Sequence, residues 1–166
     1  FRLYIDYIAY DMNSRIRAKY IETIIFRRSK NSLRFLILKR SGYTKYYPGI
    51  WQIVTGTVEK NEPYYKTAVR ESVEETNVKI KNFYAFSKLN VFYSPLKDTI
   101  NLVPVFIIEA ADDKVTLSDE HTEFEWLPVN KAVEKVFFYT QKEMLKIINL
   151  HLKNKSLFNT LIKLEL

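Results

Sequence analysis

Three acidic residues that lie close together in the sequence, Glu71, Glu74 and Glu75, have types and a spacing that suit chemistry. On a helix, residues three and four apart share one face, so these carboxylates would crowd together and repel one another. A divalent cation would relieve that repulsion. Ligation by carboxylate oxygens alone suits Mg²⁺ or Mn²⁺ and does not specially favour zinc or copper. The spacing therefore suggests a metal site, although a solvated helix surface can carry the same pattern.

The residues around the three glutamates favour the metal interpretation, because they lie at fixed distances along the chain. Gly56 precedes Glu62 by six residues, Glu62 precedes Arg70 by eight, and Arg70 is followed at once by Glu71. This arrangement resembles the Nudix box, G-x5-E-x7-R-E-U-x-E-E-x-G-U, where U is a bulky aliphatic residue. The positions that match are Gly56, Glu62, Arg70, Glu71, Glu74, Glu75 and Val78.

Two positions of the box depart from this pattern. Ser72 stands where a bulky aliphatic residue is usual, so we expect altered packing on the buried side of the helix. Asn77 stands where glycine is usual. Asparagine enters the left-handed region more readily than most residues, so Asn77 is expected to end the helix there with a positive φ.

The resemblance extends through "WQIVTGTVE" before the box and "EHTEFEWLP" after it, over roughly residues 20–153. It implies an α/β fold, namely an α/β/α sandwich with a mixed sheet in which the box forms loop–helix–loop. We interpret residues 1–166 as a single Nudix domain, in which residues 1–19 form an N-terminal extension or an edge element. The family's activity is Mg²⁺-dependent hydrolysis of a nucleoside diphosphate linked to a further group.

The resemblance also implies a role for each residue of the box. Glu71, Glu74 and Glu75 hold the metal, with the Gly56 carbonyl as an additional ligand. Arg70 pairs with box carboxylates such as Glu62 and orients them; the alternative is a plain surface ion pair.

A glutamate beyond the box often completes such sites. Glu120 and Glu123 are the candidates here, and Glu120 is favoured because it lies in the loop before a short strand. It would ligate the metal or act as general base. A solvated loop acid is the alternative reading. His121, next to it, is interpreted as structural.

Substrate contacts are expected from the end of a strand and the tyrosine-rich loop after it. Lys39 and Arg40 would bind phosphate oxygens, Arg40 through its bidentate fork. Tyr43, Tyr46 or Tyr47 would stack on a base, although tyrosines that pack within the loop are an equal alternative. Trp51 is expected in the core.

The segment "WQIVTG" is similar to the corresponding segment of the dATP and dihydroneopterin triphosphate pyrophosphohydrolases, which favours a triphosphate substrate. A dinucleoside polyphosphate or ADP-ribose hydrolase stays open. So does a non-catalytic module that binds a nucleotide or RNA, because residues 1–50 hold 11 Lys and Arg against 3 Asp and Glu. Three mutually repelling glutamates argue against a site that has lost its activity.

These residues need a scaffold of strands and helices, and hydrophobic patterning predicts one. Pro63 fits a first helical turn, with Asn61 or Glu62 as cap, and the helix should run to about Thr76. Its apolar residues Ala68, Val69 and Val73 are expected to face a core. The expected strands are Tyr20–Arg28 and Leu33–Arg40 as a hairpin, Ile50–Val54, residues 78–93, residues 99–110 and Glu123–Leu127. Helical structure is expected from Pro128 onward, including Thr140–Lys153.

The composition is that of a globular chain, with 47% hydrophobic and 27% charged residues. The absence of cysteine excludes disulfides and thiolate metal sites. No apolar run suits a bilayer and no signal peptide is recognisable, so a cytoplasmic protein without membrane contact is expected. The expected partner is a small nucleotide, with nucleic acid less favoured. The family suggests a homodimer, and residues 1–10 could pack on a partner or on the core.

Overall fold

The structure, a computed structural model, describes residues 15–29, 32–44 and 46–165. The expected packing of residues 1–10 therefore lies outside the described residues. The strands are β1 (Ile16–Arg17), β2 (Tyr20–Ser29), β3 (Ser32–Arg40), β4 (Trp51–Gln52), β5 (Val54–Thr57), β6 (Ile80–Ser94), β7 (Thr99–Ala110), β8 (His121–Leu127) and β9 (Ile162–Leu164). The helices are α2 (Tyr64–Thr76), α3 (Val129–Lys135), α4 (Tyr139–Lys153) and α5 (Lys155–Phe158).

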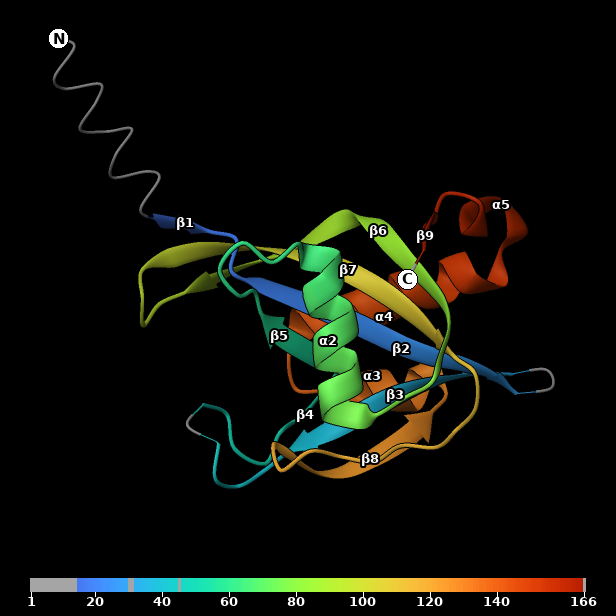
Figure 1. Ribbon diagram of the computed structural model, residues 1–166, viewed down its shortest axis with the longest axis horizontal. Helices are drawn as coiled ribbons and strands as arrows, with labels where there is room; N and C mark the ends of the chain where they lie inside the picture. Colours follow the sequence, from blue (N-terminus) through green and yellow to red (C-terminus); the bar gives the residue numbers. More distant parts are fainter. Residues whose placement is uncertain (1–14, 30–31, 45, 166) are drawn as a thin grey trace, which may run out of the picture.

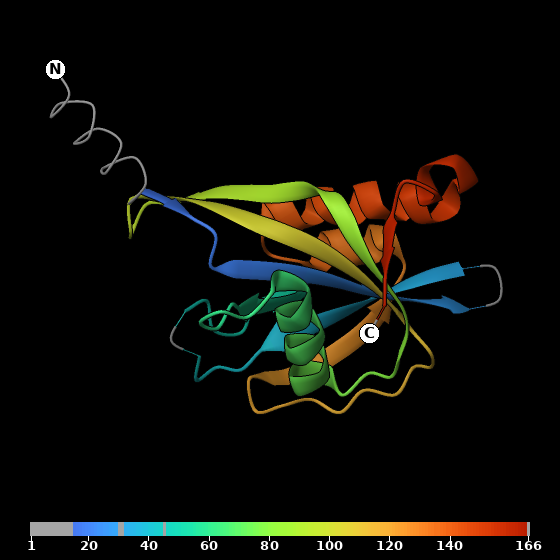
Figure 2. The same cartoon turned by 45° about the horizontal axis from the view of Figure 1, so that its top comes forward.

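The strands form one mixed sheet with the order β4-β3-β2-β7-β6-β9, in which β1 pairs with β7, β5 with β2 and β8 with β3. Helix α2 crosses one face of this sheet, and α3 and α4 cover the other (Figures 1 and 2). The predicted α/β/α sandwich is confirmed. No helix within the described ranges combines the length and apolarity that a membrane crossing requires.

Strand β2 lies at the centre, parallel to β7 and antiparallel to β3. Its side chains alternate between two cores, as the pleat requires. Ile21 and Ile25 pack on the α2 side with Ala68. Ile24 and Phe26 pack on the α4 side, in the core that also holds Leu145, Ile148 and Leu152. The two layers of helix are therefore attached to the same strand, which fixes their positions relative to each other.

Helix α2 ends as predicted and begins differently. Asn77 has φ 49° and ψ 29°, and its N–H donates to the Val73 carbonyl at 2.8 Å, so the left-handed end is confirmed. The N-cap is Pro63, and no side chain of the described residues caps the helix there, so the predicted cap by Asn61 or Glu62 is wrong. The Glu62 carboxylate instead accepts from the Glu59 N–H and from Arg70.

The buried face of α2 is also rotated relative to the prediction. Ala68 is fully buried and Val69 partly so, but Val73 is 41% exposed. Ser72, four residues after Ala68, takes the inward position because one helical turn is 3.6 residues. Its hydroxyl has no hydrogen-bond partner among the residues that the structure describes. The expectation for Val73 is therefore wrong, and the unusual serine lies against the core.

The hairpin of β2 and β3 and the long strands β6 and β7 agree with the prediction. The single strand expected at Ile50–Val54 is instead two strands, because β4 pairs with β3 and β5 with β2. Strand β8 begins at His121 rather than Glu123. The helical region after Pro128 is divided into α3 and α4, and α5 and β9 follow without having been predicted.

Candidate metal centre

Arg70 is the residue that holds the box together. Its Nε and Nη2 donate to the two carboxylate oxygens of Glu62 at 2.9 and 3.0 Å, which is a bidentate pair. Its Nη1 lies 3.0 Å from both Glu71 Oε1 and Glu74 Oε2, and its Nη2 donates to the Thr57 carbonyl at 3.2 Å. Hydrogen bonds from Arg70 lower the pKa of Glu62 to about 2. One guanidinium therefore binds three carboxylates and the loop before the helix.

Glu71 is held against the backbone at Gly56. Its Oε1 accepts from the Thr57 N–H at 3.2 Å. A Cβ atom added at Gly56 would lie 2.3 Å from Glu71 Cγ, which is closer than atoms can approach. Burial raises the pKa of Glu71, although the neighbouring Arg70 opposes the shift. Glycine at position 56 therefore allows this carboxylate to lie beside the strand.

Glu75 is a buried acid without a hydrogen-bond partner for one of its oxygens. Its side chain is almost fully enclosed, and Oε2 has no partner among the described residues. His121 Nδ1 lies 3.8 Å from Glu75 Oε2. Burial raises the pKa of Glu75 well above its ordinary value, and the charges of Glu71 and Glu120 add to this while Arg40 opposes it. A cation beside this carboxylate would stabilise its ionised form.

The glutamates are not arranged around a common point. Within the described ranges, no three carboxylate or imidazole side chains stand together as a metal-binding cluster. The reason lies in the ion pairs, because Arg70 draws Glu71 and Glu74 towards itself while Glu75 is enclosed near His121. The donor set still fits a hard divalent cation. It offers carboxylate oxygens on one helix, a backbone approach at Gly56 and the unpartnered Oε2 of Glu75.

The loop that carries Glu120 is fastened to the end of α2. The Ser118 N–H donates to the Glu75 carbonyl at 3.2 Å, and the Ser41 N–H donates to the Glu120 carbonyl at 2.8 Å. The Glu120 side chain is exposed, and its charge contributes to the raised pKa of Glu75. Glu123, the other candidate, is paired with Lys39 at 2.6 Å.

His121 is buried beside the glutamates and lies in the strand pair with Arg40. Neither ring nitrogen has a hydrogen-bond partner among the described residues. Burial, and then the charge of Arg40, lowers its pKa to about 4, so the imidazole is neutral at ordinary pH. A neutral, enclosed ring agrees with a structural role.

Of the residues expected to bind substrate, Arg40 pairs with His121 across β3 and β8, and its charge opposes the raised pKa of Glu75. Lys39 donates a hydrogen bond to the Glu123 carboxylate and is therefore already paired. Tyr43 is fully exposed and Tyr46 is half exposed, with Lys97 Nζ 5.9 Å from its ring centre. Tyr47 packs edge-on against Phe138 at 5.0 Å between ring centres. Trp51 is partly buried under Lys135, so it borders the core.

Sequence reasoning missed a second buried acid, Glu22 in β2. Its carboxylate accepts from Asn90 Nδ2 at 2.8 Å and from Gln141 Nε2 at 3.0 Å. Burial raises its pKa, and the two amide donors oppose the shift. The signal that could have found it is a single acidic residue within the apolar run "YIETIIF".

Known proteins resemble this chain in sequence and in fold. A model of the NUDIX domain matches residues 21–148. The dihydroneopterin triphosphate diphosphatase of Haemophilus influenzae is 30% identical over 131 residues, which are 71% of this chain and 80% of that protein. Nudix hydrolase 5 of Arabidopsis thaliana is 27% identical over 72% of this chain, and the match spans 40% of that longer protein.

A candidate NUDIX hydrolase from Listeria monocytogenes has a similar structure, with a TM-score of 0.72 at 24% identity. The match covers 89% of this chain and 100% of that one. At this identity the structural match supports the fold alone, whereas the NUDIX model covers most of the chain. The chain therefore belongs to the NUDIX domain family, as an enzyme of the Nudix pyrophosphohydrolase class.

Proposed function

We propose that this chain hydrolyses a pyrophosphate bond in a nucleoside triphosphate, or in a related compound of a nucleoside diphosphate and a further group, with Mg²⁺ as cofactor. The observation that carries the proposal is Glu75, a buried carboxylate whose Oε2 has no partner among the described residues and whose pKa the charges of Glu71 and Glu120 raise further. The 30% identity to a dihydroneopterin triphosphate diphosphatase favours a triphosphate.

Glu71, Glu74 and Glu75, with the carbonyl of Gly56, are the residues that would hold the metal. When bound, Mg²⁺ neutralises clustered carboxylates and phosphates and makes a coordinated water more acidic; Mn²⁺ is expected to substitute for it. Arg70 acts as a positioning residue, because its bonds to Glu62 and to the Thr57 carbonyl fix its guanidinium beside Glu71 and Glu74. Those two carboxylates would turn from Arg70 towards the cation.

Two residues outside the box complete the proposed chemistry. Glu120, exposed and close enough to affect Glu75, would accept the proton of the attacking water or add a ligand. Arg40 would bind a phosphate oxygen, since its Nε is buried without a partner in the described part of the chain. Phosphoryl transfer depends mainly on such positioning and charge neutralisation. The partner is thus a small nucleotide, and a cytoplasmic location and a homodimer remain predictions.

A substrate panel tests this proposal. The chain is incubated with Mg²⁺ and dATP, dihydroneopterin triphosphate, ADP-ribose or a dinucleoside polyphosphate, and the products are separated by chromatography. We expect pyrophosphate and a nucleoside monophosphate, or its pterin equivalent, from a triphosphate at the highest kcat/KM. A higher kcat/KM for ADP-ribose or the dinucleotide would replace the substrate assignment. Nucleotide binding without turnover of any compound would contradict catalysis and favour a binding module.

A further inference from the structure

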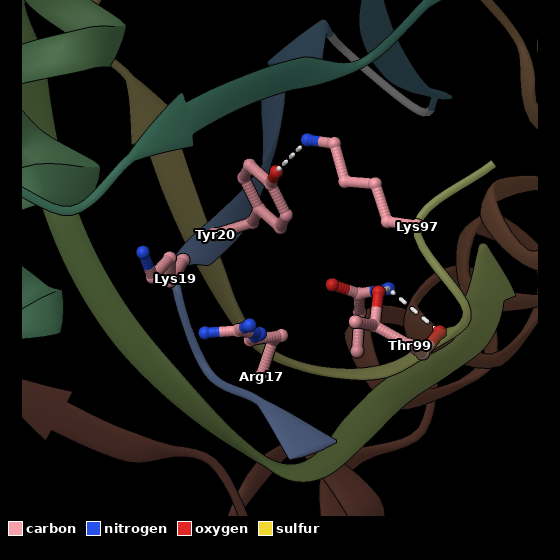
Figure 3. A pocket seen from close by; sticks show the side chains of 6 residues that line it. Arg17, Lys19, Tyr20, Lys97 and Thr99 are labelled. Carbon is pink, nitrogen blue, oxygen red and sulfur yellow. Dashed lines mark hydrogen bonds between the residues drawn. The ribbon is translucent and has the colours of Figure 1, made fainter. Parts of the chain in front are cut away.

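A pocket of about 370 Å³ lies where β1, the start of β2 and the turn between β6 and β7 meet (Figure 3). Its residue Tyr20 lies on the face of the sheet opposite α2. Tyr20 and Glu22 alternate with Ile21 along β2; Ile21 packs on the α2 side, whereas Glu22 bonds Gln141 of α4. The lining residues are Arg17, Lys19, Tyr20, Lys97, Thr99 and Asn101.

The pocket carries positive charge that no carboxylate of residues 15–29, 32–44 or 46–165 pairs with. Three of its lining residues are cationic and none is acidic. Within the described ranges, no ion pair joins Arg17, Lys19 or Lys97 to a carboxylate. Asp98 is next to Lys97 in the chain, but its carboxylate pairs with Arg15 at 3.8 Å and accepts from the Tyr93 hydroxyl at 3.0 Å.

The remaining lining groups are polar and suit an oxyanion. Figure 3 shows Tyr20 between Lys19 and Lys97, and Lys97 Nζ donates to the Tyr20 hydroxyl at 3.3 Å. The Tyr20 proton is then available to an acceptor in the pocket. Thr99 and Asn101 are buried, and Asn101 Nδ2 donates to the Thr99 carbonyl at 3.3 Å. A guanidinium fork, two ammonium groups and a phenol are donors that match a phosphate group.

The pocket is connected through the backbone to the loop of the Nudix box. Tyr20 pairs with Thr57 across the β2–β5 ladder, and the Val58 N–H donates to the Lys19 carbonyl at 2.9 Å. The Tyr64 hydroxyl donates to the Ala18 carbonyl at 2.9 Å. The Thr57 carbonyl also accepts from Arg70. Residues 57–58 therefore contact both Arg70 of the box and residues that line the pocket.

We propose that this pocket binds a phosphate group, which is either free in solution or carried by the part of the substrate farthest from the hydrolysed bond. The second source rests on the proposed function, whereas the first does not. Both use the same donors, and both account for three cations that lie beside a polar wall and have no acidic partner in the described part of the chain.

Phosphate binding is measured first, on the full chain in EDTA, by titration calorimetry with inorganic phosphate and with pyrophosphate. Without divalent cations the glutamates of the box repel anions. Arg40 is unchanged in the pocket variants, so the affinity that those variants lose reports the pocket. The double variant Arg17→Gln, Lys97→Gln should bind about tenfold more weakly or worse, because charge-assisted hydrogen bonds are the stronger kind. Lys155→Gln, at an exposed lysine in α5, is the matched control and should bind like the unmodified chain.

Absence of binding by the unmodified chain, or equal affinity in all variants, would overturn the proposal. The substituted side chains are exposed, and circular dichroism checks that the variants fold. If the double variant does not fold, Lys97→Gln alone gives the same comparison.

Turnover in Mg²⁺ then distinguishes the two sources. A nucleoside triphosphate is compared with its 3′-phosphorylated derivative. If the phosphate belongs to the substrate, the double variant raises KM for the derivative several-fold, with kcat unchanged and the parent compound unaffected. If the phosphate is free, neither KM changes and only the calorimetric affinity falls. A chain that hydrolyses nothing but loses phosphate affinity on substitution would contradict the proposed function alone.

Discussion

Gly56 is the single residue at which the smallest change should have a large effect on activity. Gly56→Ala places a methyl group 2.3 Å from Glu71 Cγ, so either the strand or the glutamate must move. A displacement of about 1 Å near reacting groups costs on the order of 100-fold in kcat/KM. We therefore expect roughly that loss in an assay of pyrophosphate release, together with weaker Mg²⁺ activation.

Gly42→Ala is the matched control for this prediction, because an added Cβ there meets no atom within 4 Å. It should retain full activity. Equal activity of Gly56→Ala and Gly42→Ala would show that the close approach of Glu71 to the backbone does not matter for catalysis.

Glu22 should make the stability of the fold depend on pH. Burial raises the pKa of Glu22 in the folded chain above its ordinary value of 4.5. Its contribution is therefore present below about 4.5 and is lost as the pH rises through the folded value. Glu22→Gln should become more stable relative to the unmodified chain as the pH rises from about 4 to about 8, measured by urea unfolding.

The control for Glu22 is Glu134→Gln, at an exposed ion pair with Lys131. The stability difference for this variant should stay nearly constant across the same pH range. A stability difference for Glu22→Gln that is also constant would mean that the buried carboxyl is ionised or protonated equally in the folded and unfolded chains.

At the scale of elements, the end of α2 depends on the left-handed conformation of Asn77. A residue with a Cβ other than Asn or Asp pays about 1 kcal/mol there, whereas glycine pays nothing sterically. Asn77→Ala should therefore lower the free energy of unfolding by about 1 kcal/mol, and Asn77→Gly should leave it nearly unchanged. Thermal and urea unfolding measure both.

Asn159 provides the matched comparison for Asn77, because it ends α5 with φ −66°. Asn159→Ala should change the free energy of unfolding by no more than about 0.5 kcal/mol. If Asn77→Ala and Asn159→Ala cost the same, the positive φ at Asn77 contributes nothing specific to the stability of the helix end.

The helices and strands also show which parts of the fold could be predicted from the sequence. Fixed spacing and the preference of Asn for positive φ were enough to predict α2 and its end at Asn77. The burial of Ser72 in place of Val73 could not be predicted, because the rotation of a helix is set by the sheet on which it packs. The division of Ile50–Val54 into β4 and β5 depends on two different partner strands, which no local pattern encodes.

For the candidate site, the spacing in the sequence predicted which residues lie together. It did not predict the ion pairs and the burial that fix their positions. Glu62, Arg70, Glu71 and Glu74 form one ion-pair network, as box positions suggest. The enclosure of Glu75 near His121 depends on the loop after β7, which meets α2 only in the folded chain. Tyr43 is fully exposed, and its expected contact with the substrate stays a prediction.

In the molecule as a whole, the box and the pocket are two charged regions of opposite sign. The glutamates of the box lie on α2, and the cationic pocket is joined to the loop before α2 through residues 18–20 and 57–58. This arrangement predicts that the box and the pocket can be altered independently. Removing cations from the pocket should leave Mg²⁺ activation unchanged, which a Mg²⁺ titration of turnover measures.

We propose above all that buried Glu75 belongs to a metal site at which a pyrophosphate bond is hydrolysed. The most direct measurement is pyrophosphate release from a triphosphate substrate across a Mg²⁺ titration, for the unmodified chain, Glu75→Gln and the surface control Glu134→Gln. We predict that EDTA abolishes turnover and that Glu134→Gln is unaffected. Replacing a residue that only orients a metal ligand costs ~10–100-fold in activity. Glu75→Gln should reduce turnover by more than that. Turnover that persists in EDTA, or that Glu75→Gln leaves unchanged, would contradict the claim.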